Sequence, residues 1–365
     1  MQLSIQTDTW YHYRVQTVFV AMSGGLDSSF SAYLLKKQGF KVIGVTFALL
    51  PKAIINTRNP KACCSLDSTT RARKVADSLS IAHYVINLRP QFEEQVIERF
   101  VAEYRCGRTP NPCILCNQHI KFSAFLQMAL TLGADAVATG HYAAIEKSES
   151  GSFLKKGKDR SKDQSYFLYP IEQHRLSSLL FPLSGHTKEA VRLTMTGLAW
   201  DSSRVRESQD ICFIPESDYR GFLSRYIPLK KGDIYLRDGK HLGIHEGIHL
   251  YTVGQRRGLN IPYAEPLYVT EIRAEENVLI VGPKEHLRGR FLIADQVNML
   301  GAQPSGRALG KVRYRQREEP CTYTLRNGQL EVTFDDFVSA ITPGQSVVLY
   351  EGDRVLGGGT IRKAS

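Results

Sequence analysis

The segment VFVAMSGGLDSSFSAYLL, residues 18–35, joins an apolar run to an amphipathic stretch through a short loop of glycine and serine. Residues 18–22 predict a buried strand, and residues 28–38 predict a helix. The loop 23–28 can hold an anion, because its glycines allow close backbone approach and the helix directs its positive end at the ligand. It lacks the lysine of the GxxxxGKS/T signature. A plain Gly-Gly turn capped by serine is the alternative, and the strand-loop-helix context favours a phosphate loop.

The same rhythm of short apolar runs and helical stretches continues to about residue 145. Because alternating strands and helices build a parallel sheet that is covered on both faces, we expect an α/β domain here. The expected strands span 18–22, 41–47, 83–88 and 135–139, and the expected helices span 28–38, 66–80, 92–104, 120–132 and 188–198. Residues 147–165 are polar and rich in lysine, which predicts an exposed loop or hairpin.

Beyond about Val205 glycines become frequent and helix-length periodicity fades. Asn327-Gly328 predicts a hairpin turn between two short strands. The expected strands span 268–272, 278–281, 307–314, 322–325, 330–334 and 346–350. The end of the chain is therefore expected to be a small antiparallel β-barrel, preceded by a smaller central module. We expect three domains, at residues 1–204, 205–288 and 289–365.

The composition favours a soluble, cytosolic protein. The chain has 365 residues with 42% hydrophobic content, and its first seventeen residues lack a signal-peptide pattern. No apolar run reaches the roughly 18 residues needed to cross a bilayer, so no membrane association is expected. The net charge of +11 favours a polyanionic partner such as nucleic acid.

Seven cysteines, an odd number in a long chain without an export signal, argue against a disulfide scaffold. Cys113 and Cys116 lie three apart in RTPNPCILCN, residues 108–117. Zinc sites, redox disulfides, iron–sulfur clusters and catalytic nucleophiles all use such spacing, so the pair alone does not choose among them.

The motif SGGLDSS, residues 23–29, resembles the SGGxDS loop of the PP-loop ATP pyrophosphatases, which have an adenine nucleotide alpha hydrolase-like fold. These enzymes cleave ATP between the α- and β-phosphates and transfer AMP to a substrate oxygen. The resemblance implies Mg²⁺ beside Asp27, although an aspartate there would also be an ordinary helix cap. It implies ATP binding by Ala21, Met22, Ser23, Gly24, Gly25, Leu26, Asp27, Ser28, Phe47 and Gly140. From the sequence alone, Phe47 would be a core residue.

Further motifs resemble those of the tRNA-specific 2-thiouridylases along nearly the whole chain. They are GRTPNPCILCN, IKF, ATGHYA, KDQSYFLY, SQDICFI, GQRRG, VRYRQ and TPGQS, in the family's order. Such enzymes adenylate the C2 oxygen of the wobble uridine, release pyrophosphate, and replace the oxygen with sulfur as AMP leaves. The resemblance implies tRNA contacts at Asn111, Pro112, Cys113, His141, Lys162, Asp163, Gln164, Arg313, Tyr314 and Gln345.

The same resemblance gives catalytic roles to Cys116 and Cys212. In the family's persulfide account, Cys212 carries sulfane sulfur and Cys116 releases it by forming a disulfide. Cys113 stands where the family commonly has aspartate. We therefore hypothesise that Cys113, Cys116 and Cys212 ligate a [4Fe–4S] cluster with one open iron, with the persulfide route as the alternative. Zinc is a further candidate, but no fourth ligand has matching spacing.

The expected partners are tRNA and a sulfur donor, either a relay protein or a cysteine desulfurase. An amidotransferase or an argininosuccinate-synthetase-like ligase is the enzymatic rival, and it leaves the three cysteines and the C-terminal barrel unexplained. A tRNA-binding protein without catalysis is the other rival, and the complete SGGLDS loop argues against it.

Overall fold

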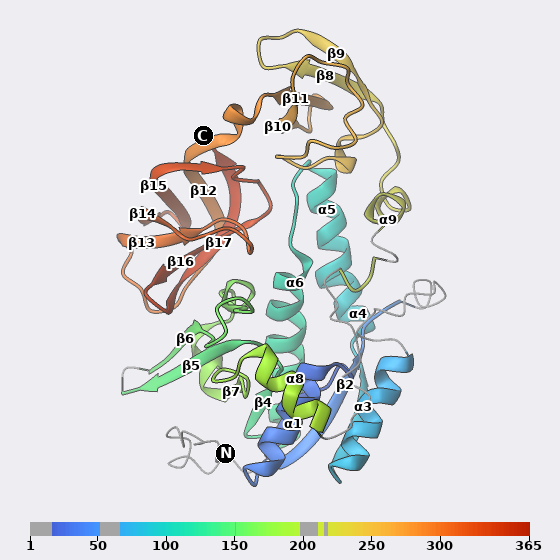
Figure 1. The fold of residues 1–365 in the computed structure, drawn as a ribbon, viewed down its shortest axis with the longest axis vertical. Coiled ribbons are helices and arrows are strands. Elements are labelled where there is room, and N and C mark those ends of the chain that lie inside the picture. The colour runs from blue at the N-terminus through green and yellow to red at the C-terminus, as the bar shows by residue number, and fades with distance from the viewer. Residues whose placement is uncertain (1–16, 52–65, 150, 198–210, 215–217) are drawn as a thin grey trace.

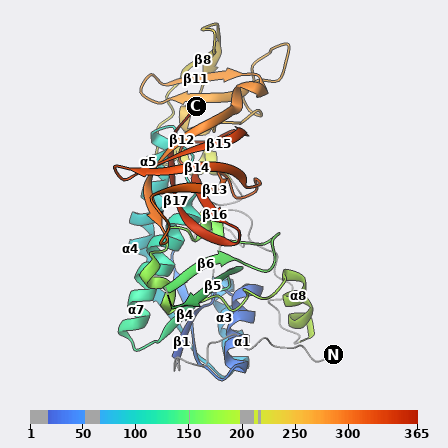
Figure 2. The ribbon, with the colours of Figure 1, turned by 90° about the vertical axis from the view of Figure 1, so that its left-hand side faces the viewer.

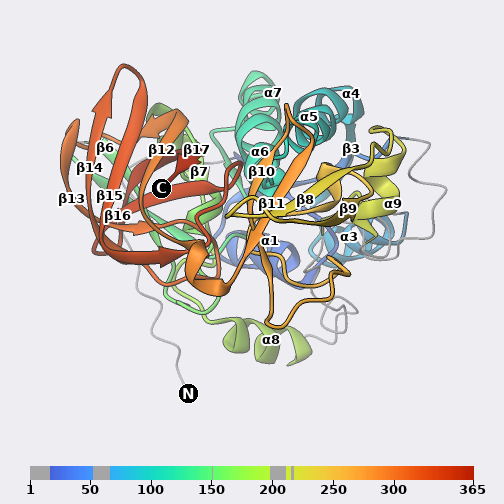
Figure 3. The same ribbon diagram turned by 90° about the horizontal axis from the view of Figure 1, so that it is seen from above.

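The computed structural model of the chain describes residues 17–51, 66–149, 151–197, 211–214 and 218–365. An α/β part forms the base, a β-barrel in red lies at one side above it, and a small module in yellow and orange forms the far end (Figure 1). In the turned view the barrel strands are stacked between β8 and β11 above and β5 and β6 below (Figure 2). Seen from above, the barrel lies to one side of that module and of α4 and α5 (Figure 3).

The base contains a five-stranded parallel sheet in the order β3-β2-β1-β4-β7. Its strands are β1 (Thr17–Ala21), β2 (Lys41–Ala48), β3 (Ala82–Asn87), β4 (Ala136–Ala138) and β7 (Leu179–Leu180). The helices α1 (Leu26–Lys37), α3 (Leu66–Ser78) and α8 (Lys188–Gly197) belong to the same part. All four expected strands and these three expected helices are confirmed. The order places β1 where the chain switches direction across the sheet, which is where open α/β sheets bind ligands.

Two long helical segments rise from the base toward the far module. The first combines α4 (Arg89–Phe92), the π-helical η2 (Glu93–Glu98) and α5 (Arg99–Arg105), and the expected helix at 92–104 is confirmed. The second combines α6 (Pro112–Leu115), the π-helical η3 (Cys116–Phe125) and α7 (Leu126–Thr131). The expectation that it begins at residue 120 is wrong, because Asn111 caps it and Pro112 occupies its first position.

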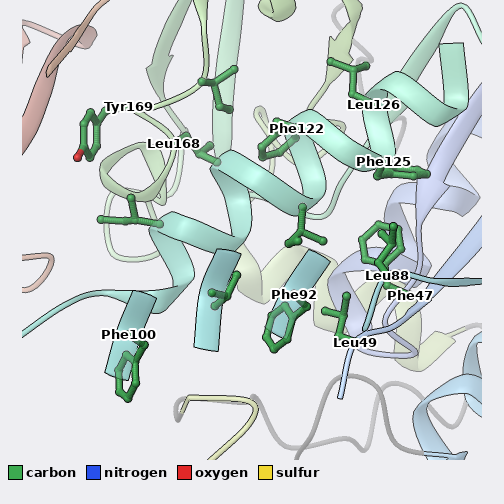
Figure 4. Packing of buried hydrophobic residues seen from close by; sticks show 14 of the residues in the cluster. Phe47, Leu49, Leu88, Phe92, Phe100, Phe122, Phe125, Leu126, Leu168 and Tyr169 are labelled. Atoms are coloured by element: carbon green, nitrogen blue, oxygen red, sulfur yellow. The ribbon is translucent and has the colours of Figure 1, made fainter. Parts of the chain in front are cut away.

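These two segments pack through aromatic side chains into the largest hydrophobic cluster of the molecule. Figure 4 shows Phe47, Phe92, Phe100, Phe122 and Phe125 among its members. Each fully buried side chain of this size contributes about 1.5–3 kcal/mol to folding. The cluster therefore fixes the second helical segment against the parallel sheet.

The end of the chain forms a ring of six antiparallel strands in the order β12-β15-β14-β13-β16-β17, which closes through β12 and β17. The strands are β12 (Arg288–Met299), β13 (Ser305–Lys311), β14 (Glu319–Arg326), β15 (Gln329–Ser339), β16 (Ser346–Glu351) and β17 (Arg354–Ala364). The predicted barrel is confirmed, but two of its strands, β12 and β17, were not predicted, although they are 12 and 11 residues long.

A hairpin of the base also joins this sheet. It consists of β5 (Ala143–Ser148) and β6 (Gly151–Lys156), and β6 pairs with β17 at Lys155 and Arg354. The predicted hairpin is therefore present, but the expectation of an exposed segment is only partly right, because Leu154 is fully buried.

The far module has a four-stranded sheet in the order β10-β11-β8-β9. Its elements are α9 (Tyr219–Ser224), β8 (Gly232–Leu236), β9 (His241–His245), β10 (Tyr268–Arg273) and β11 (Val278–Gly282).

Short 3-10 helices occur in several parts of the chain and are η4 (Ser165–Phe167), η5 (Gln173–Ser178), η8 (Ile248–Leu250) and η9 (Lys284–Leu287). Among the described residues, no helix is both long and apolar enough to cross a lipid bilayer. The predicted boundaries at 204 and 288 stay predictions.

Candidate active site

The loop expected to hold phosphate turns sharply at Gly24. Its φ is +70°, and a Cβ there would lie 2.2 Å from the carbonyl oxygen of Ser68, so the position requires glycine. The Ser23 N–H donates to Ser28 Oγ at 3.2 Å, and the Ser28 hydroxyl donates to the Gly25 carbonyl at 3.0 Å. The loop is thus closed on itself directly before α1, whose N-terminal end favours an anion.

Asp27, in the first turn of α1, is held by two side chains from later elements. Lys188 Nζ donates to both carboxylate oxygens at 2.7 Å, and Tyr142 Oη donates to Oδ1 at 2.8 Å. The Lys188 side chain is 8% exposed and the Asp27 side chain 31% exposed. Asp27 therefore keeps an outward side that a cation can reach. Neither partner was predicted from the sequence, although Lys188 lies at the start of an expected helix.

Gly140, at the end of β4, lies against the start of α1. A Cβ on Gly140 would be 2.8 Å from the Asp27 carbonyl carbon and from the Ser28 nitrogen. This strand end and the phosphate loop are therefore brought together as expected for neighbouring parallel strands. The implied contact of Gly140 with the nucleotide stays a prediction.

His141 follows as a buried, neutral histidine. Its Nδ1 lies 2.7 Å from Thr139 Oγ1, and its ring packs beside Phe122 and Phe181. Burial lowers the pKa of His141 well below its usual range, and the nearby Lys121 adds to this. At neutral pH this ring can hold and orient a neighbour but carries no charge.

Other residues expected to bind ATP belong to the core in this structure. Met22 is buried, and its N–H donates to the Val45 carbonyl at 2.7 Å. Phe47 packs edge-to-face on Phe125 with ring centroids 4.8 Å apart. Ala21 and Leu26 flank the loop at the ends of β1 and α1. A nucleotide role for these residues stays a prediction.

The cysteine pair lies at the beginning of the second helical segment. Asn111 Oδ1 accepts from the Cys113 N–H at 3.1 Å, which makes Asn111 the helix cap, and Pro112 is buried beside it. Cys113 is exposed and Cys116 half-buried. Residues three apart on a helix are neighbours, so both thiols face one side of the segment. A helix N-terminus favours the thiolate form of a cysteine placed there.

Cys212 is brought to the same hydrophobic cluster that borders Cys116. The neighbouring Phe213 is 1% exposed and packs edge-to-face on Phe92 and Phe100, with centroid distances of 5.8 and 5.3 Å. Cys212 itself is half-buried. The aromatic anchor thus fixes the described segment 211–214 against the helix that rises from the sheet.

The hypothesis of an iron–sulfur cluster receives no support from this arrangement. Within the described ranges, which include Cys113, Cys116 and Cys212, no three histidine, cysteine or acidic residues are grouped closely enough to hold a metal ion. The residues present do not fit such a group. Cys63 and Cys64 lie outside the described residues.

The segment Lys162-Asp163-Gln164 was expected to contact tRNA. Asp163 is buried and accepts hydrogen bonds from the Gly157 N–H at 2.9 Å and the Ser165 hydroxyl at 2.7 Å. Burial raises the pKa of Asp163, and these hydrogen bonds oppose the rise. Gln164 Oε1 accepts from the Tyr142 N–H at 2.9 Å. Asp163 and Gln164 therefore hold the backbone beside the phosphate loop, and Lys162 is half-buried.

The three expected tRNA contacts in the barrel are also tied to the protein. Arg313 donates to the Val253 carbonyl at 3.0 Å and to the Thr342 hydroxyl. Gln345 Nε2 donates to the Thr109 carbonyl at 2.7 Å. Tyr314 lies over Phe167, with ring centroids 4.4 Å apart. Burial lowers the pKa of Arg313. Their contacts with tRNA stay predictions.

Comparison with known proteins supplies the context for these residues. Three family models match in succession: a tRNA methyl transferase HUP domain over residues 16–216, a tRNA methyl transferase PRC-barrel domain over 220–283, and an aminomethyltransferase beta-barrel domain over 290–361. The first of them covers more than half of the chain.

Curated relatives are similar over almost the full length. A tRNA-specific 2-thiouridylase MnmA of Halothermothrix orenii is 44% identical, with 95% of this chain and 99% of that protein covered. Proteins of the same name from Geotalea uraniireducens and Geobacter metallireducens are 45% and 46% identical, each over 95% of this chain and over 95% and 97% of their own lengths.

Proposed function

The chain belongs to the family of tRNA-specific 2-thiouridylases, and from this membership we propose that it thiolates C2 of the wobble uridine of tRNA in an ATP-dependent reaction. The observation that carries the proposal is the identity of 44–46% to curated members over about 95% of the chain. The glycine-rich loop at the switch point of a parallel sheet agrees with a PP-loop enzyme. We therefore infer that the protein is a sulfurtransferase whose substrates include ATP and tRNA.

The first step is adenylation. The uridine O2 attacks the α-phosphorus of ATP, the bond to the β-phosphate breaks, and pyrophosphate leaves. The loop 23–28 and the N-terminal end of α1 would bind the phosphates through backbone N–H groups. The Lys188 ammonium, which already faces the loop at Asp27, adds a positive charge to the same side.

Mg²⁺ fits this loop through Asp27. Its carboxylate is partly exposed and stands in the first turn of α1. Oxygen ligands of this kind suit Mg²⁺, which would neutralise charge on the departing pyrophosphate. Lys188 and Tyr142 would hold this carboxylate in place through their hydrogen bonds to its oxygens.

For the sulfur step we favour the persulfide route. The terminal sulfur of a Cys212 persulfide attacks C2, and AMP departs with the former O2. The Cys116 thiolate then attacks Sγ of Cys212, which breaks the bond to the transferred sulfur and forms a disulfide. Two electrons pass from the cysteine pair to that sulfur, and an external dithiol must reduce the disulfide before the next cycle. Cys116 and Cys212 are both half-buried and both pack against the largest hydrophobic cluster.

Substitution of Cys113 separates the two sulfur routes. Under the persulfide route Cys113→Asp keeps thiolation, because aspartate is the common residue here in the family, whereas Cys116→Ser and Cys212→Ser abolish it. The variants would be purified anaerobically, and bound iron and 2-thiouridine measured. Joint loss of iron and activity in Cys113→Asp would support a cluster instead.

The rival function is a tRNA-binding protein without catalysis. An enzyme and a simple tRNA-binding protein differ in pyrophosphate release from ATP. Only with the enzyme does addition of a tRNA with an unmodified wobble uridine stimulate this release. The assay pairs pyrophosphate detection with filter binding of the same tRNA. Binding of tRNA without release of pyrophosphate would overturn the enzymatic proposal. The Asp27→Asn variant is the control, because it shows whether the pyrophosphate comes from the phosphate loop of this protein.

A cytoplasmic location and a sulfur donor belong to the same proposal. The net charge of +11 suits a tRNA substrate. A relay protein or a cysteine desulfurase would load Cys212, which is half-buried rather than enclosed.

A further inference from the structure

Lys188, whose ammonium group binds Asp27 beside the phosphate loop, is the first residue of α8. Later turns of this helix are fixed by Val191 and Met195, which are fully buried in a hydrophobic cluster with Leu26 of α1. At the start of the helix, by contrast, polar partners set the position of the backbone. The placement of the ammonium group therefore depends on how this first turn is held.

Two side chains cap the start of α8. Thr187 Oγ1 accepts from the Ala190 N–H at 3.2 Å. The Lys188 N–H is one of the four N–H groups at a helix start that have no acceptor inside the helix, and it donates to Asp159 Oδ2 at 2.9 Å. Asp159 lies 29 positions earlier in the chain, after the hairpin of β5 and β6. One lysine thus has its backbone held by Asp159 and its ammonium held by Asp27.

The Asp159 carboxylate is in turn fixed by its own segment. The Ser161 N–H and hydroxyl donate to Asp159 Oδ1 at 3.1 and 2.7 Å, and the Lys162 N–H donates to the Asp159 carbonyl at 3.1 Å. Burial alone would raise the pKa of Asp159, but the hydrogen bonds from Lys188 and Ser161 outweigh it and lower the pKa. Asp159 is therefore charged at neutral pH, with one oxygen on its own turn and the other on α8.

The other end of this segment reaches Asp27 by a second route. The Gln164 N–H donates to the Tyr142 carbonyl at 2.8 Å, and Gln164 Oε1 accepts from the Tyr142 N–H at 2.9 Å. Tyr142 Oη then donates to Asp27 Oδ1 at 2.8 Å. Lys188 Nζ lies 5.8 Å from the centroid of the Tyr142 ring. The segment 159–164 therefore holds both of the residues that bind the Asp27 carboxylate.

We propose that Asp159 is a positioning residue for the adenylation step, which places the Lys188 ammonium at Asp27 by fixing the first N–H of α8. This rests on the proposed function, in which Lys188 adds positive charge beside the phosphates of ATP. Without Asp159 the first turn of α8 has an unpaired N–H and is free to shift. A misplacement of about 1 Å near reacting groups can lower a rate by up to about two orders of magnitude. Asp159 acts through Lys188 alone.

The test is a double-mutant cycle of Asp159→Ala and Lys188→Met, which compares initial rates of pyrophosphate release at saturating tRNA and varied ATP. Loss of one hydrogen bond to a charged group changes an equilibrium by about tenfold, so Asp159→Ala alone should lower kcat by about that factor. In the Lys188→Met background the same substitution should change nothing, because its effect passes through the lysine. Asp353→Ala is the matched control and should keep the parental rate. It removes the carboxylate that binds Arg160 of the same segment at 2.6 Å.

A second measurement requires no turnover. Lys188 is acetylated with acetic anhydride in the absence of substrates, and its labelling rate is followed by mass spectrometry. Its side chain is 8% exposed, so labelling should be several-fold faster in Asp159→Ala and unchanged in Asp353→Ala. Asp159→Asn keeps an oxygen for the Lys188 N–H and should lie between the parent and Asp159→Ala in both measurements. Circular dichroism checks that the variants fold.

The proposal is overturned if Asp159→Ala keeps the parental rate, or if its loss persists in full on top of Lys188→Met. The second result, with unchanged labelling of Lys188, would make Asp159 only a support of its own segment. A parent protein that releases no pyrophosphate would instead contradict the proposed function. The labelling rates would still decide the role of Asp159 in that case, so the two failures are distinguishable.

Discussion

Lys188 Nζ lies 2.7 Å from both carboxylate oxygens of Asp27, across 161 positions of sequence. The pair is asymmetric, because the lysine is buried and the aspartate is partly exposed. A charge left in a buried place is more costly than one that water can reach. Replacement of the aspartate and replacement of the lysine should therefore lower the free energy of unfolding by different amounts.

Asp27→Asn should therefore destabilise the protein more than Lys188→Met. We expect a loss of about 1–3 kcal/mol for Asp27→Asn, because the ammonium loses its carboxylate partner inside the protein. Lys188→Met replaces the charge with an apolar chain of similar length, and Asp27 turns to solvent. Urea unfolding without ATP measures both. Equal losses would contradict the asymmetry.

Lys188→Met should nevertheless impair the reaction. If Lys188 adds its charge to the phosphate side of the loop, pyrophosphate release falls by about two orders of magnitude. Lys188→Arg restores part of it because the charge remains. Initial rates at saturating tRNA and varied ATP provide the measurement, and Lys37→Met on the exposed end of α1 is the control. An unchanged rate in Lys188→Met would exclude the role.

Gly140→Ala should shift the phosphate loop. The added Cβ would approach the backbone of Asp27 and Ser28 to 2.8 Å, and overpacking of this kind costs about 1–3 kcal/mol. Gly185→Ala is the matched control, since a Cβ there meets nothing within 4 Å. Thermal unfolding and ATP titration calorimetry compare the two. A Gly140→Ala variant with parental stability and ATP affinity would show that the backbones adapt without strain.

Phe213→Ala should release the segment that carries Cys212. The ring is buried against Phe92 and Phe100, and loss of a buried phenylalanine costs about 3–5 kcal/mol where the site cannot collapse. We expect faster alkylation of Cys212 and slower thiolation. Phe337→Ala, an exposed position of the barrel, should change neither. Unaltered Cys212 reactivity would mean that the ring does not hold the segment.

Stability should depend on pH through His141. Burial holds the pKa of His141 well below the value of about 6.5 for an unfolded histidine, so below that pH only the unfolded state gains a proton. The stability that neutral His141 contributes is present above pH 6.5 and is lost as the pH falls, by up to about 1.4 kcal/mol per pH unit. His141→Gln lacks this dependence. The difference in unfolding free energy between parent and variant should therefore shrink as the pH is lowered from 7.5 to 5.5. A difference that stays constant would show that His141 is not the source of the pH dependence.

The sequence predicted the α/β base because its elements have strong local patterns. Strand, loop and helix follow one another within residues 18–35, and the parallel strands are short buried runs. The catalytic motifs were found through family resemblance, since a Cys-x-x-Cys pair alone has too many uses. The helix start at Pro112 was missed, because the helix was expected only from residue 120, although Asn111 and Pro112 are suited to a helix cap and a first helical position.

The other features that were not predicted from the sequence depend on contacts between residues far apart in the chain. Strand β17 contains Gly357, Gly358 and Gly359, which suggest a turn, but a Cβ on Gly357 would lie 2.3 Å from the Asn298 carbonyl oxygen of β12. Close packing between strands, invisible in a local window, explains those glycines. The bonds of Lys188 to Asp27 and of Gln345 to Thr109 likewise join residues that no local pattern relates.

The hairpin of β5 and β6 has one further consequence, which concerns biosynthesis. Its hydrogen bonds from Lys156 to the turn at Gly352 and Asp353 join residues 196 and more positions apart, so they cannot form until the ribosome has made the barrel strands that lie between them. Until then β6 presents an uncovered edge, which is a site for pairing with other chains. A stop codon anywhere before Gly352 would leave that edge open permanently. Protection of the hairpin edge against pairing with other chains thus depends on residues 352–354, which are made long after it.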